Sequence, residues 1–161
     1  MGCVVSDEGV PDSSLVLRSP TGVVLCAEPC GINKSCRMGI LAARVEDDNS
    51  VSFDIECPNE YRETPNLAHT SWTAGVMSEI CGQTPVFFGT LVFTGTVTTR
   101  FQAPVPMGER LIGRATIEGR ERRKIFVGAT LTSSVSGTEL VRASAITIAI
   151  EMRNLQGRGL A

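Results

Sequence analysis

Apolar and polar residues alternate most clearly in residues 50–57. The apolar set is Val51, Phe53, Ile55 and Cys57, and the polar set is Ser52, Asp54 and Glu56. A period of two is typical of a strand with one face in a core and the other toward solvent. Residues 22–27 and 39–45 carry short apolar runs bounded by turn residues, so we predict strands there as well.

A helix is predicted after a polar loop over residues 58–67. Thr70 or Ser71 can cap its start, and Gly82, with Pro85 just beyond, can end it after about three turns. Small residues fall on one face of this helix at helical spacing, namely Ser71, Ala74, Gly75, Ser78 and Gly82. Such a face predicts close approach of another backbone or of a ligand.

From residue 86 onward the chain is rich in Val, Ile, Thr and Phe. Turn residues interrupt this run at 104–108, 119–121 and 133–138, which predicts three or four long antiparallel strands. One helix followed by a series of paired strands predicts an α+β fold.

Length and composition favour one domain. The chain has 161 residues, of which 42% are apolar and 20% charged, and this is enough for a single core. We expect the domain to cover residues 15–151, after a disordered tail over 1–14 and before a C-terminal tail over 152–161.

Charge and hydropathy limit the functional classes. The formal net charge of -2 disfavours a nucleic-acid binder that works by neutralising phosphates. The sequence lacks both the long apolar run of a membrane span and a secretory signal, so we expect no membrane partner and a cytoplasmic location. The opening MGCVVS does fit the myristoylation pattern, with Cys3 placed for a second acyl chain. A plain disordered tail is the alternative.

The six cysteines are expected to be reduced thiols, because the chain is long enough to form a core without disulfides. Cys26, Cys30 and Cys36 are spaced C-x3-C-x5-C, which lacks the paired C-x2-C knuckles of a structural zinc site. We therefore predict no metal and no cofactor.

His69 is the only histidine, and it stands at the mouth of the predicted helix. The first turn of a helix carries backbone N–H groups without intrahelical partners, and these suit an anionic or oxyanionic ligand. We therefore predict a ligand site at this helix start. The alternative is a histidine that only caps the helix.

Five short motifs can be read in order between about residues 26 and 150. They are Cys30-Gly31-Ile32-Asn33, Gly39-Ile40-Leu41, His69-Thr70-Ser71, RFQAPVPMG over 100–108, and Glu121-Arg122-Arg123-Lys124. Their order resembles that of the hotdog-fold acyl-CoA thioesterases, especially the branch related to phenylacetate-degradation thioesterases.

This resemblance implies a hotdog fold, in which a curved antiparallel sheet wraps a long central helix. It also implies a homodimer or homotetramer with acyl-CoA sites between subunits. The thioester is expected at the helix start, where a backbone N–H polarises the carbonyl. A carboxylate farther along the helix activates water or attacks directly.

The sequence departs from the family at the site itself. The family's two glycines after the histidine are Thr70 and Ser71 here, whose side chains narrow the pocket. Nine residues after His69, where the family has its catalytic acid, stands Ser78, and Glu79 follows. Successive helix residues point about 100° apart, so the two cannot both face one ligand. Ser78 lies on the small-residue face, so geometry favours it as the residue in the pocket. Glu79 has the carboxylate that the chemistry needs, and a bulge near Thr70 would bring it to the site.

The same resemblance assigns further site residues. Thr94 stands where related enzymes hold a water, and Asn66, Thr70 and Ser71 are expected to contact the oxyanion or substrate. CoA phosphates are expected on the basic cluster, which consists of Arg120, Arg122, Arg123 and Lys124. The alternative for Thr94 is an ordinary strand threonine, and the alternative for the basic cluster is a strand end exposed to solvent.

The leading hypothesis is hydrolysis of an acyl-CoA thioester, with His69, Ser78, Glu79 and Thr94 as the catalytic candidates. A second hypothesis is a noncatalytic hotdog protein that binds an acyl-CoA or a small acid, because the enzymes' acid and glycines are replaced here. A hydratase acting on enoyl thioesters is a third.

Overall fold

The computed structural model describes residues 36–151. Several predictions fall outside these residues. They concern the tails over 1–14 and 152–161, the strand over 22–27, the MGCVVS start and the motif over 30–33.

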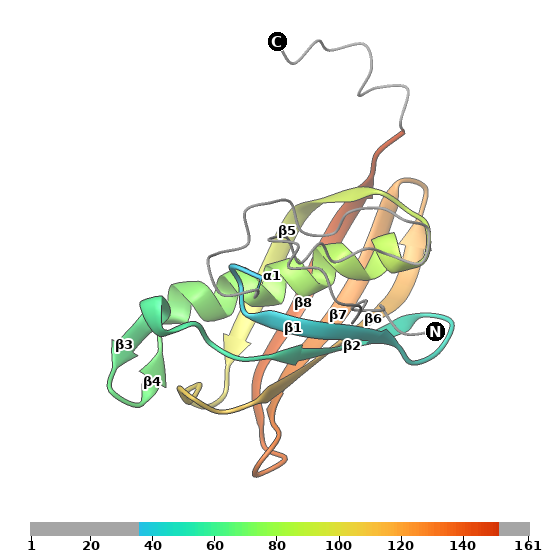
Figure 1. Ribbon diagram of the computed structural model, residues 1–161. Coiled ribbons are helices and arrows are strands. Elements are labelled where there is room, and N and C mark those ends of the chain that lie inside the picture. The colour runs from blue at the N-terminus through green and yellow to red at the C-terminus, as the bar shows by residue number, and fades with distance from the viewer. Residues whose placement is uncertain (1–35, 152–161) are drawn as a thin grey trace, which may run out of the picture.

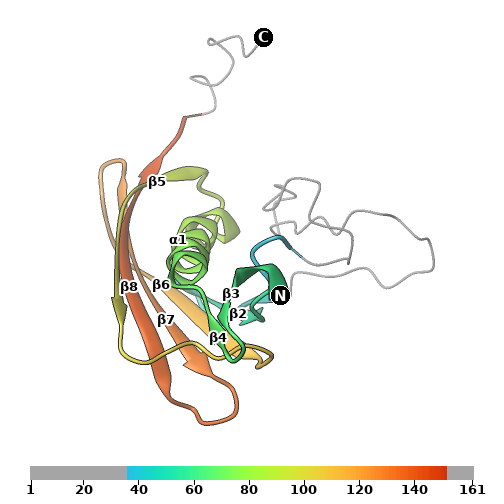
Figure 2. The ribbon, with the colours of Figure 1, turned by 90° about the vertical axis from the view of Figure 1, so that its left-hand side faces the viewer.

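In the described part of the chain six strands form one antiparallel sheet, and a single long helix lies along one of its faces (Figure 1, Figure 2). The strand order is β1-β2-β6-β7-β8-β5. The strands are β1 (Ile40–Val45), β2 (Ser50–Ile55), β5 (Val92–Phe101), β6 (Leu111–Glu121), β7 (Lys124–Ser133) and β8 (Glu139–Ala149), and the helix is α1 (Thr70–Phe87). The predicted α+β class is therefore confirmed.

The alternation predicted for residues 50–57 is confirmed in β2. Val51, Phe53 and Ile55 are fully buried toward α1, as the period of two requires. Ser50 and Ser52 are buried as well, on the outer side, and the Ser52 hydroxyl donates to the Glu46 carboxylate.

A glycine in β6 lets the helix pack closely on the sheet. A Cβ at Gly113 would lie 2.8 Å from Ile55 Cδ1 and 3.1 Å from Ile80 Cδ1. Both distances are shorter than ordinary carbon contacts, so a side chain there would push α1 away from β2.

The helix does not end at Gly82, as predicted, but continues to Phe87 with Pro85 inside its last turn. Pro85 cannot donate a backbone hydrogen bond and its ring crowds the carbonyl one turn earlier, but the residue is buried in the packed part of the helix. The true stop signal is Gly89, which has φ +83°. Its N–H and that of the next residue each donate to carbonyls of the last turn at 3.0 Å, which forms a Schellman motif.

Other boundaries also moved. The β-rich run begins as a strand only at Val92, because residues 86–88 complete and cap the helix. The turn predicted at 119–121 lies at Arg122 and Arg123, and Arg122 adopts φ +53°. The predicted loop over 58–67 contains a 3-10 turn (Asn59–Tyr61) and a small hairpin, β3 (Arg62–Thr64) and β4 (Leu67–Ala68).

Candidate functional site

His69 caps the start of α1. Its Nδ1 accepts from the Ser71 backbone N–H at 3.1 Å and lies 2.7 Å from Ser71 Oγ. An accepting Nδ1 fits the neutral imidazole with its proton on Nε2. Both residues are exposed, so the predicted helix-start residues do lie together at an open end of the helix.

The hairpin β3–β4 fixes this end in place. The His69 N–H donates to Tyr61 O at 2.7 Å, and the Ala68 N–H donates to Val105 O at 2.9 Å. Asn66 also takes part, because its carbonyl accepts from the Met107 N–H at 2.9 Å. The segment over 104–108, predicted as a turn and as part of the motif over 100–108, thus lies beside the helix start.

A cavity of about 340 Å³ opens beside the first turn of α1. Thr70 and Thr73 border it from the helix, and Phe101 borders it from the end of β5. The other lining residues come from the hairpin β3–β4 and from the segment that follows β5, namely Glu63, Leu67, Ala68, Gln102, Ala103, Pro104 and Val105. Its volume lies at the small end of the range for ligand pockets.

Ser78 and Thr94 lie on the same side of the helix. A Cβ at Gly82 would lie 3.2 Å from Thr94 Oγ1, and Ser78 stands one turn before Gly82 on the same face. Farther along β5, Val97 is 38% exposed and Phe101 is 47% exposed. We call this partly open strip, formed by Ser78 and Gly82 of α1 and by Thr94, Val97 and Phe101 of β5, the β5 flank.

Glu79 lies on another side of α1. Its Oε1 accepts from Gln83 Nε2 at 2.8 Å. Glu79 stands about 100° around the helix from Ser78, so the two side chains do not share the β5 flank. The helix is regular from Thr70 onward, so the bulge that would have moved Glu79 toward Thr94 is not present.

Gln83 was overlooked in the sequence. It is only 4% exposed, and its Oε1 has no hydrogen-bond partner among residues 36–151. Its position four residues after Glu79 is the signal that could have identified it, because side chains at that spacing meet on a helix.

The basic cluster lies far from the helix start within one chain. Arg120 Nη1 donates to Thr90 Oγ1 at 3.3 Å, just after the helix ends, and Arg123 Nε donates to Ala149 O at 3.2 Å. The cavity lies at the other end of these strands, beside Phe101. Strands of this length separate the two ends by roughly 30 Å.

Two buried thiols are poor nucleophiles. Burial raises the pKa of Cys57 and of Cys81 to about 12, so both stay protonated near neutral pH.

Among residues 36–151 no group of three or more His, Cys, Asp or Glu is placed to hold a metal ion. No helix of that part of the chain is long and apolar enough to cross a membrane.

No family model matches the sequence, and no curated protein matches it. Solved structures do match. One is a thioesterase superfamily protein that is 20% identical, with 66% of this chain and 52% of that chain covered and a TM-score of 0.61. Another is an acetyl-CoA-bound protein of Streptococcus mutans, 15% identical, with 67% of this chain and 86% of that chain covered and a TM-score of 0.61.

A hypothetical thioesterase protein of Streptococcus pneumoniae with coenzyme A also matches. It is 13% identical, with 70% of this chain and 88% of that chain covered and a TM-score of 0.61. The chain has the fold of thioesterase superfamily proteins. It spans about half of the first structure, 52%, and most of the two streptococcal ones. The resemblance noted in the sequence is thus confirmed at the level of this superfamily's fold.

Proposed function

We propose that this protein is an acyl-CoA thioesterase, which hydrolyses a CoA thioester to a free acid and CoA. The observation that carries the proposal is the cavity beside the first turn of α1 in a thioesterase-type fold. CoA or acetyl-CoA is bound in two of the similar structures. In this proposal residues 15–151 form one hotdog domain of the phenylacetate-degradation thioesterase-like branch, with the sheet curved around α1.

The thioester carbonyl is held at the start of α1. The Thr70 N–H precedes the first hydrogen bond within the helix, and Thr70 borders the cavity. A fixed donor there stabilises the oxyanion that develops when water attacks, and the helix dipole adds partial positive charge. His69 and Ser71 keep this turn in shape, and Asn66 contacts the substrate from the adjoining hairpin.

The attacking water is held on the β5 flank of a neighbouring subunit between its Ser78 and Thr94, because within one chain Ser78 lies roughly 12 Å along the helix from Thr70. Ser78 and Thr94 are sixteen residues apart. Structures of the pneumococcal protein include a variant with an aspartate changed to alanine and another with a threonine changed to alanine. Those two positions are also sixteen residues apart. The common spacing supports Ser78 and Thr94 as a functional pair, with a serine in place of the acid.

Glu79 is the proposed general base. A serine needs a base within reach to take its proton, and Glu79 is the carboxylate adjacent to Ser78 in the helix. Glu79 points about 100° away from Ser78, so it does not face the attacking water itself: its carboxylate leaves the hydrogen bond with Gln83 and takes the proton through a second water. The bond to Gln83 is a 2.8 Å contact at the side of the helix, which a side-chain rotation can break.

The basic cluster binds the phosphates of a CoA molecule whose thioester lies in the cavity of a neighbouring subunit. In a dimer joined antiparallel along the two β5 edges, the partner runs in the reverse direction. Its β6–β7 turn then lies toward the cavity end of the first subunit. Arg122, Arg123 and Lys124, with Arg120 beside them, can bind phosphate oxygens through charge-assisted hydrogen bonds. This arrangement explains why the cluster and the cavity lie at opposite ends of one chain.

A noncatalytic acyl-CoA binder is the second candidate. The observation that favours it is that Ser78 occupies the β5 flank while Glu79 is held by Gln83. A site without an acid on this flank keeps its oxyanion donor and its cavity, so it can bind a thioester without hydrolysing it.

An activity screen tests the proposal. Purified protein is given short, medium, long and aromatic acyl-CoAs, and thiol release is measured. The expected result is turnover well above buffer for at least one chain class. Turnover no better than buffer across the panel contradicts the hydrolase. Calorimetry with the same esters then identifies a binder by saturable heat, and absence of binding rejects both candidates.

A further inference from the structure

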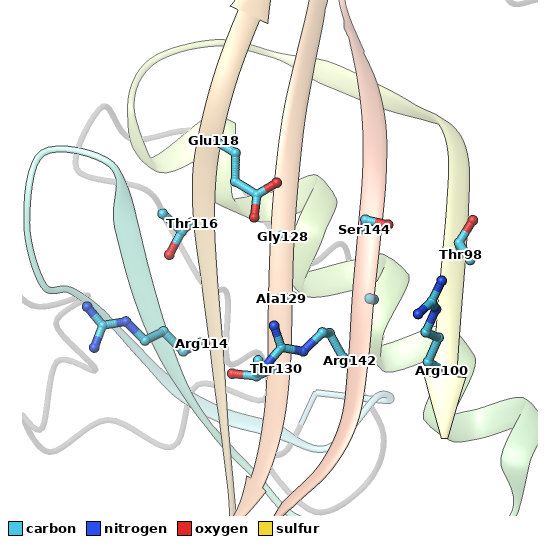
Figure 3. A pocket seen from close by; sticks show the side chains of 11 residues that line it. Thr98, Arg100, Arg114, Thr116, Glu118, Gly128, Ala129, Thr130, Arg142 and Ser144 are labelled. Carbon is cyan, nitrogen blue, oxygen red and sulfur yellow. The ribbon is translucent and has the colours of Figure 1, made fainter. Parts of the chain in front are cut away.

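The outer face of the sheet, away from α1, carries a hollow of about 370 Å³ (Figure 3). It spans four neighbouring strands, β6, β7, β8 and β5. Its lining residues are Thr98, Arg100, Arg114, Thr116, Glu118, Gly128, Ala129, Thr130, Arg142, Ala143 and Ser144. None of them belongs to the site proposed beside the first turn of α1.

One end of the hollow is a row of arginines. Arg114 pairs with Thr130, Thr130 pairs with Arg142, and Arg142 pairs with Arg100 in successive strands. Arg142 and Arg100 are therefore directly opposite each other. Like charges in that position destabilise a sheet unless an opposite charge offsets them.

The arginines are only partly neutralised. Arg142 donates through Nε and Nη2 to Glu139, at 2.8 Å each, which holds its guanidinium in place and leaves Nη1 unused. Arg114 Nη2 lies 3.7 Å from Asp47. Arg100 has no ion pair with any residue in the described part of the chain, so its charge faces the hollow unmatched.

The next row forms the floor. Thr116 pairs with Gly128, Gly128 pairs with Ser144, and Ser144 pairs with Thr98. All four side chains are small, so the hollow results from this row, and three of them carry hydroxyl groups that can donate to an oxyanion.

Glu118 closes the other end. It is the extra residue of a β-bulge between Ile117 and Gly119, and bulges turn side chains out of the regular alternation. Its side chain lies across Gly128, where a Cβ would overlap the carboxylate. Within residues 36–151 the carboxylate makes no hydrogen bond or ion pair, so its oxygens are free to accept from a ligand.

We propose that this hollow binds a small phosphate monoester that also carries hydroxyl or amino groups. The phosphate lies between Arg100 and Arg142 and accepts from the hydroxyls of the floor. The donor groups of the ligand reach the Glu118 carboxylate. The cavity volume is near the lower limit for small-molecule sites, which fits a ligand of nucleotide or sugar-phosphate size.

The test uses AMP, adenosine and inorganic phosphate as probes in calorimetry with the full chain at low salt. We expect saturable AMP binding, weaker phosphate binding and no adenosine binding. Arg100→Gln is expected to weaken AMP and phosphate binding about tenfold or more, because it removes a charge-assisted hydrogen bond. Glu118→Ala should weaken AMP binding and leave phosphate binding unchanged.

Arg44→Gln is the matched control. Arg44 is another exposed strand arginine, paired with Asp54 at 3.2 Å on β1, and its loss should not change AMP binding. Absence of AMP binding, or equal binding by the Arg100 variant, overturns the proposal. The proposal is also overturned if light scattering shows that a second copy of the chain covers this face, and that the sole effect of Arg100→Gln is to convert the dimer to monomers. Thioester hydrolysis by the Arg100 variant is expected to match that of the parent, so the two proposals fail separately.

Discussion

At the scale of single residues, the neighbours Ser78 and Glu79 of α1 point to different sides of the helix and suit different chemical roles. Ser78 stands on the β5 flank with Thr94, and Glu79 stands about 100° around the helix with Gln83. The sequence could show that the two cannot face one ligand together. It could not show which one faces Thr94, because that depends on how the sheet sets the rotation of the helix.

Glu79→Gln is expected to lower kcat for the best acyl-CoA by about 10²-fold or more, because general-base assistance is typically worth 10² to 10⁴. Ser78→Ala, one residue away in the same helix, is the comparison: it removes one hydrogen bond to the attacking water and should lower kcat much less, by about tenfold. Thiol release at saturating substrate measures both, and the fold of each variant is checked by circular dichroism. The reverse ranking would remove Glu79 from the mechanism and leave Ser78 and Thr94, which hold the water, as the main catalytic residues.

At the scale of elements, strand positions were predictable and the helix end was not. The turn residues at 104–108 and 133–138 separate strands in the structure as they do in the sequence. Gly82 and Pro85 look like a helix stop, but Gly82 is needed for the approach to Thr94 and Pro85 fits the last turn. Local turn signals located the breaks at 104–108 and 133–138, but they misplaced the tight turn at Arg122 and Arg123. They also made Gly82 look like a helix stop, where the close approach of Thr94 explains the glycine.

Gly89→Ala is expected to destabilise the fold by about 1 kcal/mol, because alanine pays a steric cost at positive φ that glycine avoids. Gly89 has φ +83° and has no neighbour within 4 Å of a Cβ built there, so the effect isolates backbone strain. Gly89→Asn is the control and should lose less, because asparagine tolerates this region. Urea unfolding followed by tryptophan fluorescence measures the free energy of unfolding. Equal losses for both variants would attribute the effect to something other than backbone conformation.

At the scale of the whole molecule, the edge strand β5 is open beside the proposed site. β5 is paired only with β8, so one row of its backbone groups is unpaired within the described sheet. Val97 and Phe101 of β5 are 38% and 47% exposed, and Phe101 borders the cavity. An unpaired edge with exposed apolar side chains favours pairing with a second copy, and the distance between cavity and basic cluster favours the same arrangement.

Val97→Asp is therefore expected to shift the protein from dimer to monomer and to abolish acyl-CoA binding. The substitution places a charge at the expected seam, where the two copies would bring like charges together. Val135→Asp is the matched control, because Val135 is 82% exposed in the β7–β8 turn, away from β5. Light scattering at micromolar concentration measures the assembly, and calorimetry with an acyl-CoA measures the site. A Val97 variant that is monomeric yet binds acyl-CoA as the parent does would show that one chain completes the site alone, and CoA phosphates would then need contacts other than the basic cluster of a partner.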